Sequence, residues 1–270
     1  MLLLSSKRFF PSLILLSIIW IVFANYMDHQ NLPSLTPEVS NEIGGVPDFN
    51  SHETSRHKKQ AFLDFLFPII VDENLFLMRI RTQLEEFKEK QKLQSLNESE
   101  LEWLNQLKMD YLIETDDIES TIDALLRKVD IIPPSLVLAQ AALESGWGSS
   151  RIAQESNNLF GHRCFEEGCG AMPIQRGQGN THESAKFDSI NESIRSYLKN
   201  LNSFHRYKEF RTLRSQTELN QGGKGVLKLL PGLMPYSELG ELYLRKVAKM
   251  IKQNKLHRYD ALFYEQINKK

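Results

Sequence analysis

Apolar residues recur at helical spacing along most of the chain from residue 60 onward. Between residues 60 and 113 they lie three or four positions apart, with mixed charges between them, which predicts helices that pack on one another. Asn97-x-x-Glu100 matches the capping box that begins a helix. Because this stretch has no cluster of catalytic residue types, we interpret residues 59–113 as a helical accessory region that the chemistry does not require.

A second set of helical patterns, interrupted by an irregular stretch, lies between residues 114 and 258. We expect helices over residues 117–129, 135–145 and about 237–255, and one that begins at the capping box Ser189-x-x-Glu192. Between residues 146 and 185 glycines and polar residues replace the periodicity, which indicates a short β-hairpin. The pattern predicts an α+β domain, predominantly α, over residues 114–258, followed by a C-terminal tail over residues 259–270.

The first 26 residues have the pattern of an export signal. Lys7 and Arg8 precede sixteen uncharged residues, Phe9 to Ala24, as in a secretory signal peptide. Since this run is only slightly short of a membrane span, an uncleaved membrane anchor is the alternative. Residues 27–58 are rich in proline, glycine and polar residues and have little periodicity, so we interpret them as a flexible linker.

Composition and charge exclude several classes of protein. Hydrophobic residues make up 41% and charged residues 25%, as in soluble globular proteins. A net charge of -1 provides no basic field, which argues against nucleic acid as a partner. Two cysteines are too few for a disulfide scaffold or a four-thiolate zinc site, and the histidines lack the short pairings of zinc ligands. We therefore expect no metal and no cofactor.

Glu144 is the first candidate for chemistry. It lies in the last turn of a predicted helix that stops at Gly146. The negative end of the helix dipole and the apolar neighbours both raise the pKa of a carboxyl group there, and a protonated carboxyl is what a general acid needs. The alternative is an ordinary solvated glutamate. Trp147, between two glycines, fits stacking on a sugar face or, equally, closing the helix end as a core residue.

Several segments together resemble a known family. IPPSLVLAQAALESGWG (132–148), followed by NNLFG (157–161), resembles the signature of the bacterial glucosaminidases that cut peptidoglycan, glycoside hydrolase family 73. FEEGCG (165–170), THE (181–183) and YSELGELY (236–243) are similar to the Bax-like subgroup. The resemblance covers about residues 115–256, and a weaker likeness reaches back to about residue 60.

This resemblance implies a lysozyme-like fold, in which a helical lobe carries the acid and a small β-hairpin lobe closes over the cleft. Glu144 matches the family's catalytic acid. Glu183 occupies the place of a second carboxylate on the β-lobe, and a solvated loop glutamate is the alternative. Tyr243 and Tyr207 match tyrosines that line the cleft, with helix-face packing as the alternative for both.

Asn158 and Phe160 would form the floor of the cleft, and Trp147 is a further candidate for substrate binding. We also expect a disulfide between Cys164 and Cys169, because export places them in an oxidising compartment and four intervening residues make a short, closable loop. Two free thiols are the alternative.

The expected function is that of a peptidoglycan hydrolase that cuts after N-acetylglucosamine, with Glu144 as the general acid. Its partner would be the glycan strand, in the periplasm or at the inner membrane. The separation of two carboxylates sets inversion or retention, and attack by the substrate's own acetamido group needs no second carboxylate. The alternatives are a lytic transglycosylase or muramidase, or a non-catalytic wall-binding scaffold.

Overall fold

The computed structural model describes residues 32–37, 42–92, 96–164, 166, 168–171, 183–219 and 224–269. The predicted signal peptide or anchor, residues 1–26, lies outside these residues. Among the helices that the structure does describe, none combines the length and the apolar character that crossing a membrane requires.

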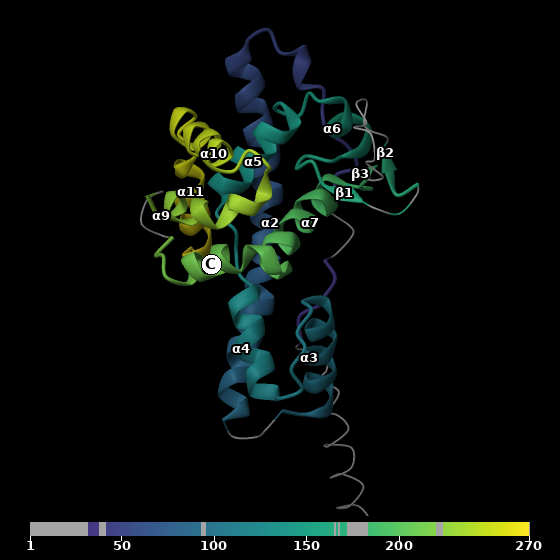
Figure 1. The fold of residues 1–270 in the computed structure, drawn as a ribbon, viewed down its shortest axis with the longest axis vertical. Coiled ribbons are helices and arrows are strands. Elements are labelled where there is room, and N and C mark those ends of the chain that lie inside the picture. Colours follow the sequence, from purple (N-terminus) through teal and green to yellow (C-terminus); the bar gives the residue numbers. More distant parts are fainter. Residues whose placement is uncertain are drawn as a thin grey trace, which may run out of the picture.

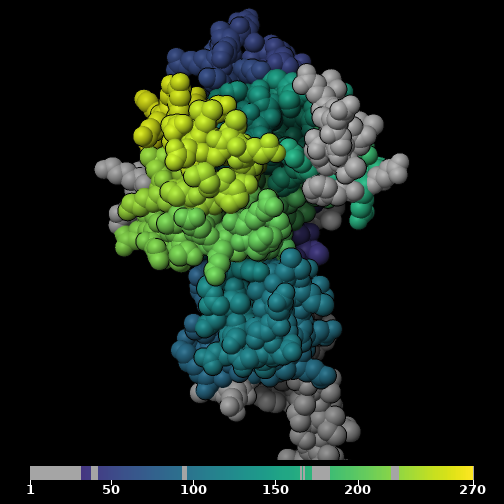
Figure 2. Space-filling model, in the orientation of Figure 1, coloured from purple at the N-terminus to yellow at the C-terminus, as the bar shows by residue number. Residues whose placement is uncertain are grey.

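Helix α2, Ser55–Gln91, runs through the whole length of the molecule (Figure 1). Thr54 begins it, because the Thr54 hydroxyl accepts a hydrogen bond from the backbone N–H of His57 at 3.1 Å. Helices α3, Glu98–Asp110, and α4, Ile118–Lys128, lie beside the C-terminal half of α2. The C-terminal half of α2, with α3 and α4, forms the narrower lower part of the molecule, drawn in blue and teal in Figure 2.

The wider upper part surrounds α5, Pro134–Ser145, which packs against α2, α10 and α11. Pro134 opens α5, and Gly146 ends it in the left-handed conformation, with φ of 60°. The other helical elements are η2 (Phe49–Ser51), α6 (Arg151–Ser156), α7 (Ile190–Ser203), η3 (His205–Tyr207), α8 (Lys208–Ser215), α9 (Lys224–Leu229), η4 (Leu230–Tyr236), α10 (Glu241–Gln253) and α11 (His257–Ile267).

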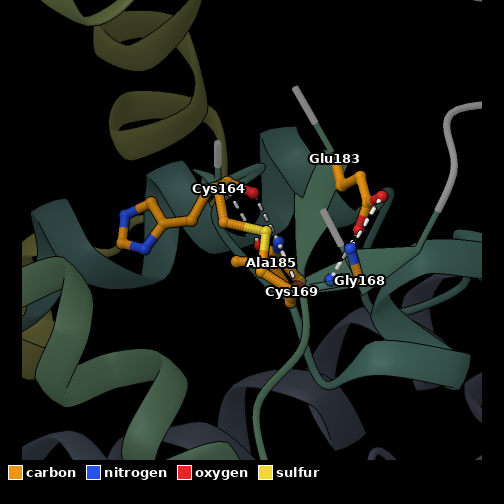
Figure 3. The surroundings of a disulfide bond; sticks show 8 residues. Cys164, Gly168, Cys169, Glu183 and Ala185 are labelled. Atoms are coloured by element: carbon orange, nitrogen blue, oxygen red, sulfur yellow. Dashed lines mark hydrogen bonds between the residues drawn. A yellow bond between two sulfur atoms is a disulfide. The ribbon is translucent and has the colours of Figure 1, made fainter. Parts of the chain in front are cut away.

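Three short strands form the β part: β1, Arg163–Cys164, β2, Gly170–Ala171, and β3, Glu183–Ala185. The central strand is β3, and it pairs antiparallel with both neighbours. A disulfide joins Cys164 to Cys169, with the Cα atoms 6.1 Å apart (Figure 3). The predicted fold class, α+β and predominantly α with a small β-lobe, is confirmed, although a three-stranded sheet replaces the simple hairpin.

At the N-terminal side, the predicted segments pack on the rest of the chain. Helix α2, in the predicted accessory region of residues 59–113, shares one hydrophobic core with α5 and α7. The predicted flexible linker, residues 27–58, is packed in part: Phe49 is 3% exposed and the backbone N–H of Ile43 donates to Oδ1 of Asn191 at 3.0 Å. Periodicity shows that a segment is helical, but it does not show which distant helix covers it.

Residues 259–267 of the predicted tail belong to α11, which holds α5 in place. Pro133 gives the start of α5 no side-chain cap. Asp260 of α11 supplies it: Oδ1 accepts from the backbone N–H of Ser135 at 2.8 Å, and Oδ2 accepts from the Ser135 hydroxyl at 2.6 Å. Burial raises the pKa of Asp260 to about 6, against the opposing effect of these hydrogen bonds.

Phe62→Ala tests whether α2 belongs to the core. Phe62 is fully buried, and its ring contacts that of Trp147 at 5.7 Å between centroids. We expect the substitution to lower the free energy of unfolding by about 3–5 kcal/mol, measured by denaturant titration. Met109→Ala is the matched control, because Met109 is 62% exposed, and it should change stability by less than about 0.5 kcal/mol. Equal effects of the two substitutions would contradict the shared core.

Asp260→Asn tests the pH dependence of the cap. The folded pKa, about 6, lies above the ordinary value of 3.8, so the contribution of Asp260 to stability is fully present below about pH 4 and is lost as the pH rises through about 6. The stability of wild type relative to Asp260→Asn should therefore fall over that window, by on the order of 2–3 kcal/mol. Asp72→Asn, which changes an exposed aspartate of α2, is the matched control. The difference in stability between wild type and this control should stay nearly constant over the same pH range. A constant difference for Asp260→Asn would refute the raised pKa.

Candidate active site

Glu144, in the last turn of α5, lines a pocket of about 520 Å³. Figure 2 shows the surface hollowed between the yellow-green residues of η4 and α10 and the teal residues that follow α5. The other lining residues come from three segments: Phe160, Gly161, His162 and Arg163; Asn200, Arg206 and Tyr207; and Pro235, Tyr236, Ser237, Glu238 and Leu239. Segments far apart in the sequence thus converge on one carboxyl group.

Two features of its surroundings suit the Glu144 carboxyl group to the role of a proton donor. Burial raises its pKa, whereas a hydrogen bond from Tyr243 and the charge of Lys246 lower it by less. Gly161 faces it, with φ of +67°, and a Cβ added there would lie 3.6 Å from Oε2 of Glu144. The glycine therefore leaves space directly beside the carboxyl group.

A chain of buried hydrogen bonds fixes the direction of the proton on Tyr243. The Tyr197 hydroxyl donates to Oε1 of Gln140 at 2.6 Å, and Nε2 of Gln140 donates to the Tyr243 hydroxyl oxygen at 2.8 Å. Because the Tyr243 oxygen accepts from Gln140, its own proton is directed to Glu144. Neither Gln140 nor Tyr197 was among the site residues predicted from the sequence. The signal for Gln140 was its polarity within an apolar run, one helical turn before Glu144.

Aromatic rings build the wall of the pocket around this chain. Tyr236 stacks on Tyr243, with ring centroids 5.3 Å apart, and its hydroxyl donates to the carbonyl of Phe160 at 3.0 Å. Phe160 stacks in turn on Tyr197, at 4.2 Å between centroids. The structure therefore places Phe160 and Tyr207 in the pocket lining and Tyr243 beside Glu144, and it adds Tyr236, which was not among the predicted site residues.

Two predicted binding residues lie elsewhere. The Asn158 side chain is 2% exposed, donates to the carbonyls of His162 and Ala185 and accepts from the N–H of His162, so it holds the 158–162 loop against β3. Trp147 packs on Phe62, and the Lys59 ammonium lies 5.0 Å from its ring centroid. Neither side chain lines the pocket described above, and Trp147 takes the core role given as its alternative.

Glu183 is neither a pocket residue nor a solvated loop residue. It is 7% exposed, and its two carboxylate oxygens accept from the backbone N–H groups of Gly168, at 3.2 Å, and Gly170, at 2.9 Å (Figure 3). Its side chain thus stabilises the loop that the Cys164–Cys169 disulfide closes. The structure does not bring Glu183 into the pocket that Glu144 lines.

Sequence comparisons match a known family to the part of the chain that forms this pocket. Residues 119–256 match the glucosaminidase family model, described as mannosyl-glycoprotein endo-beta-N-acetylglucosaminidase. Protein bax of Escherichia coli K12 is 30% identical over 217 residues, which are 80% of this chain and 76% of that protein. The chain belongs to the glucosaminidase family. The matched residues include Glu144 and every lining residue of the pocket.

Other relatives of this family member match over shorter stretches. Exo-glucosaminidase LytG of Bacillus subtilis is 43% identical over 54 residues, 18% of this chain and 19% of LytG. Peptidoglycan hydrolase FlgJ of Escherichia coli K12 is 29% identical over 135 residues, 46% of this chain and 41% of FlgJ. Among solved structures, the catalytic domain of the autolysin Auto from Listeria monocytogenes is 18% identical, with a TM-score of 0.41, over 88% of this chain and 97% of that domain.

Tyr243→Phe tests the hydrogen bond to Glu144. Because that hydrogen bond lowers the pKa of Glu144, its loss should raise the pKa further, as measured by NMR titration of the Glu144 carboxyl carbon. The control is Tyr207→Phe, which removes a hydroxyl from the same pocket that is bonded to Asn200 instead. We expect this control to leave the pKa of Glu144 unchanged. An unchanged or lower pKa in Tyr243→Phe would show that Tyr243 does not stabilise the carboxylate.

Proposed function

We propose that this chain is an exported peptidoglycan hydrolase that cleaves the β-1,4 bond after N-acetylglucosamine, with Glu144 as the general acid. The observation that carries the proposal is the half-buried Glu144 carboxyl at the pocket, with its raised pKa and its hydrogen bond from Tyr243. The names of two relatives, a peptidoglycan hydrolase and an exo-glucosaminidase, support the same substrate class.

In the proposed reaction, Glu144 donates its proton to the glycosidic oxygen as the bond to the anomeric carbon breaks. The hydroxyl of Tyr243 then stabilises the carboxylate that remains. The acetamido oxygen of N-acetylglucosamine attacks the anomeric carbon and forms a cyclic intermediate. Water opens this ring and returns a proton to Glu144, which restores both the enzyme and the acetamido group.

Attack by the acetamido group is favoured over a carboxylate pair because Glu183 is held by Gly168 and Gly170 at the disulfide loop. Glu238 also lines the pocket, but its side chain is solvent-exposed, unlike that of Glu144. A base or nucleophile that pairs with Glu144 would have to lie within a few ångströms of the reacting sugar. The proposed mechanism therefore uses one carboxyl group of the protein.

We also propose that the chain acts in the periplasm, either free or held at the inner membrane by its first 26 residues. The basic start and apolar run of that segment support export. The disulfide between Cys164 and Cys169 fits the same compartment, because disulfides persist where the environment is oxidising.

Glu144→Gln should abolish hydrolysis while the fold and glycan binding persist. Glutamine keeps the shape of the side chain but has no proton to donate, and general acid catalysis contributes about two to four orders of magnitude. Release of reducing ends from purified glycan strands measures the loss, and a thermal melt checks the fold. Reducing N-acetylglucosamine ends support the proposal, whereas anhydromuramic acid ends would replace it with a lytic transglycosylase.

Two matched substitutions decide the mechanism. Glu183→Gln and Glu238→Gln make the same change at the two further carboxylates considered above. We expect each variant to keep at least about a tenth of the wild-type rate. A loss as large as that of Glu144→Gln in either variant would replace acetamido attack by a carboxylate pair. Near-wild-type hydrolysis by folded Glu144→Gln would overturn the whole assignment.

A further inference from the structure

Two arginines of the pocket have no structural role that the described residues reveal. Arg163, in β1, and Arg206, in η3, line the pocket together with Glu144. Neither forms an ion pair with any residue that the structure describes. Both side chains are solvent-exposed, and the described ring contact of Arg206 is with Phe204, at 5.9 Å.

Three neighbouring arginines differ from these two, because their guanidinium groups bind other groups of the folded chain. Arg195 pairs with Glu73 and Glu42. Arg211 donates to the carbonyls of Leu201 and Phe204, and the buried Arg214 donates to the carbonyls of Lys128, which ends α4, and of Ile131. Among the residues that the structure describes, no carboxylate occupies the guanidinium groups of Arg163 and Arg206, which leaves them to a ligand in the pocket.

The charge balance of the pocket favours an anionic ligand. Its described carboxyl groups are Glu144 and Glu238, and burial shifts Glu144 toward its neutral, protonated form. The described lining then holds two guanidinium groups and one exposed carboxylate, that of Glu238. A guanidinium binds a carboxylate through two parallel N–H groups, which provides orientation as well as attraction.

This argument rests on the proposed function, because it concerns which glycan the same pocket accepts. A polymer of N-acetylglucosamine alone is neutral. In peptidoglycan every second sugar is N-acetylmuramic acid, which carries a lactyl group that is either a free carboxylate or linked to a stem peptide with carboxylates of its own. Only the second polymer offers an anion beside each bond that the enzyme would cut.

We propose that Arg163 and Arg206 bind a carboxylate carried by the N-acetylmuramic acid next to the scissile bond, and thereby select peptidoglycan over neutral N-acetylglucosamine polymers. The carboxylate belongs either to the free lactyl group or to the stem peptide. Both sources present the same chemistry to the pocket, and substrates that contain one or the other separate them.

The test compares kcat/KM for wild type, Arg163→Gln, Arg206→Gln and the double variant on three soluble substrates: peptide-bearing glycan strands, strands freed of peptide by an amidase, and neutral N-acetylglucosamine oligomers. Each single substitution should lower kcat/KM about tenfold on a carboxylate-bearing strand, as expected for loss of a charged hydrogen bond. On the neutral oligomers the change should stay within about twofold. Arg245→Gln is the charge-matched control, since Arg245 pairs with Glu241 and does not line the pocket.

Loss confined to peptide-bearing strands assigns the carboxylate to the stem peptide, and loss confined to peptide-free strands assigns it to the lactyl group. Equal loss on the neutral oligomers, or no loss on either strand, overturns the inference while leaving the proposed hydrolysis intact. If wild type cleaves none of the substrates, the binding of the same soluble strands, measured by isothermal titration calorimetry, replaces kcat/KM. Weaker strand binding by the double variant than by Arg245→Gln would then support the carboxylate site, even though the proposed hydrolysis had failed. Equal binding by the two variants would overturn the carboxylate site.

Discussion

Helix α5 is buried on nearly all of its faces, and this constraint arranges the helices around it. Leu136, Val137, Leu138 and Ala139 are four successive residues of α5 with 0% exposure. A helix that is apolar all round is stable only when other elements remove each face from water. The N-terminal half of α2 and the C-terminal helices α10 and α11 therefore meet at α5, although they lie at opposite ends of the chain. The carboxyl group of Glu144 is carried on this firmly held element.

The polar groups inside this apolar surrounding form a continuous chain. Tyr197 donates to Gln140, Gln140 donates to Tyr243, and Tyr243 is hydrogen-bonded to Glu144. A buried polar group left without a partner costs about 1–3 kcal/mol, so each member stabilises the arrangement of the next. The same hydrogen bonds that stabilise the core therefore fix the proton positions at the candidate active site.

The β part positions the opposite wall of the pocket. Asn158 holds the loop that contains Gly161 to β3, and Tyr236 holds it from η4 through the carbonyl of Phe160. The disulfide and Glu183 stabilise the neighbouring loop from within. In this arrangement Glu183 contributes to the structure of the β part, and Gly161 brings the backbone close to Glu144.

Local signals in the sequence determined much of this protein. The capping box at Asn97, the N-cap at Ser189, the helix stop at Gly146 and the candidate acid Glu144 all depend on residues within a few positions of one another. The fold class and the family signature follow from such segments in order. A helix end interacts with residues that are its neighbours along the chain, so the sequence is sufficient to predict that interaction.

Tertiary structure alone decided the contacts that complete the site. Ser135 and Asp260 are 125 positions apart, Gln140 and Tyr243 are 103 apart, and Ile43 and Asn191 are 148 apart. No local pattern marks such pairs, so the sequence alone did not predict that residues 42–58 and α11 pack against the rest of the chain. Glu183 was expected as a second carboxylate from the family resemblance, and only the structure shows that it accepts hydrogen bonds from Gly168 and Gly170. Hydrogen bonding and burial act between atoms that are close in space, and only the folded chain establishes which atoms those are.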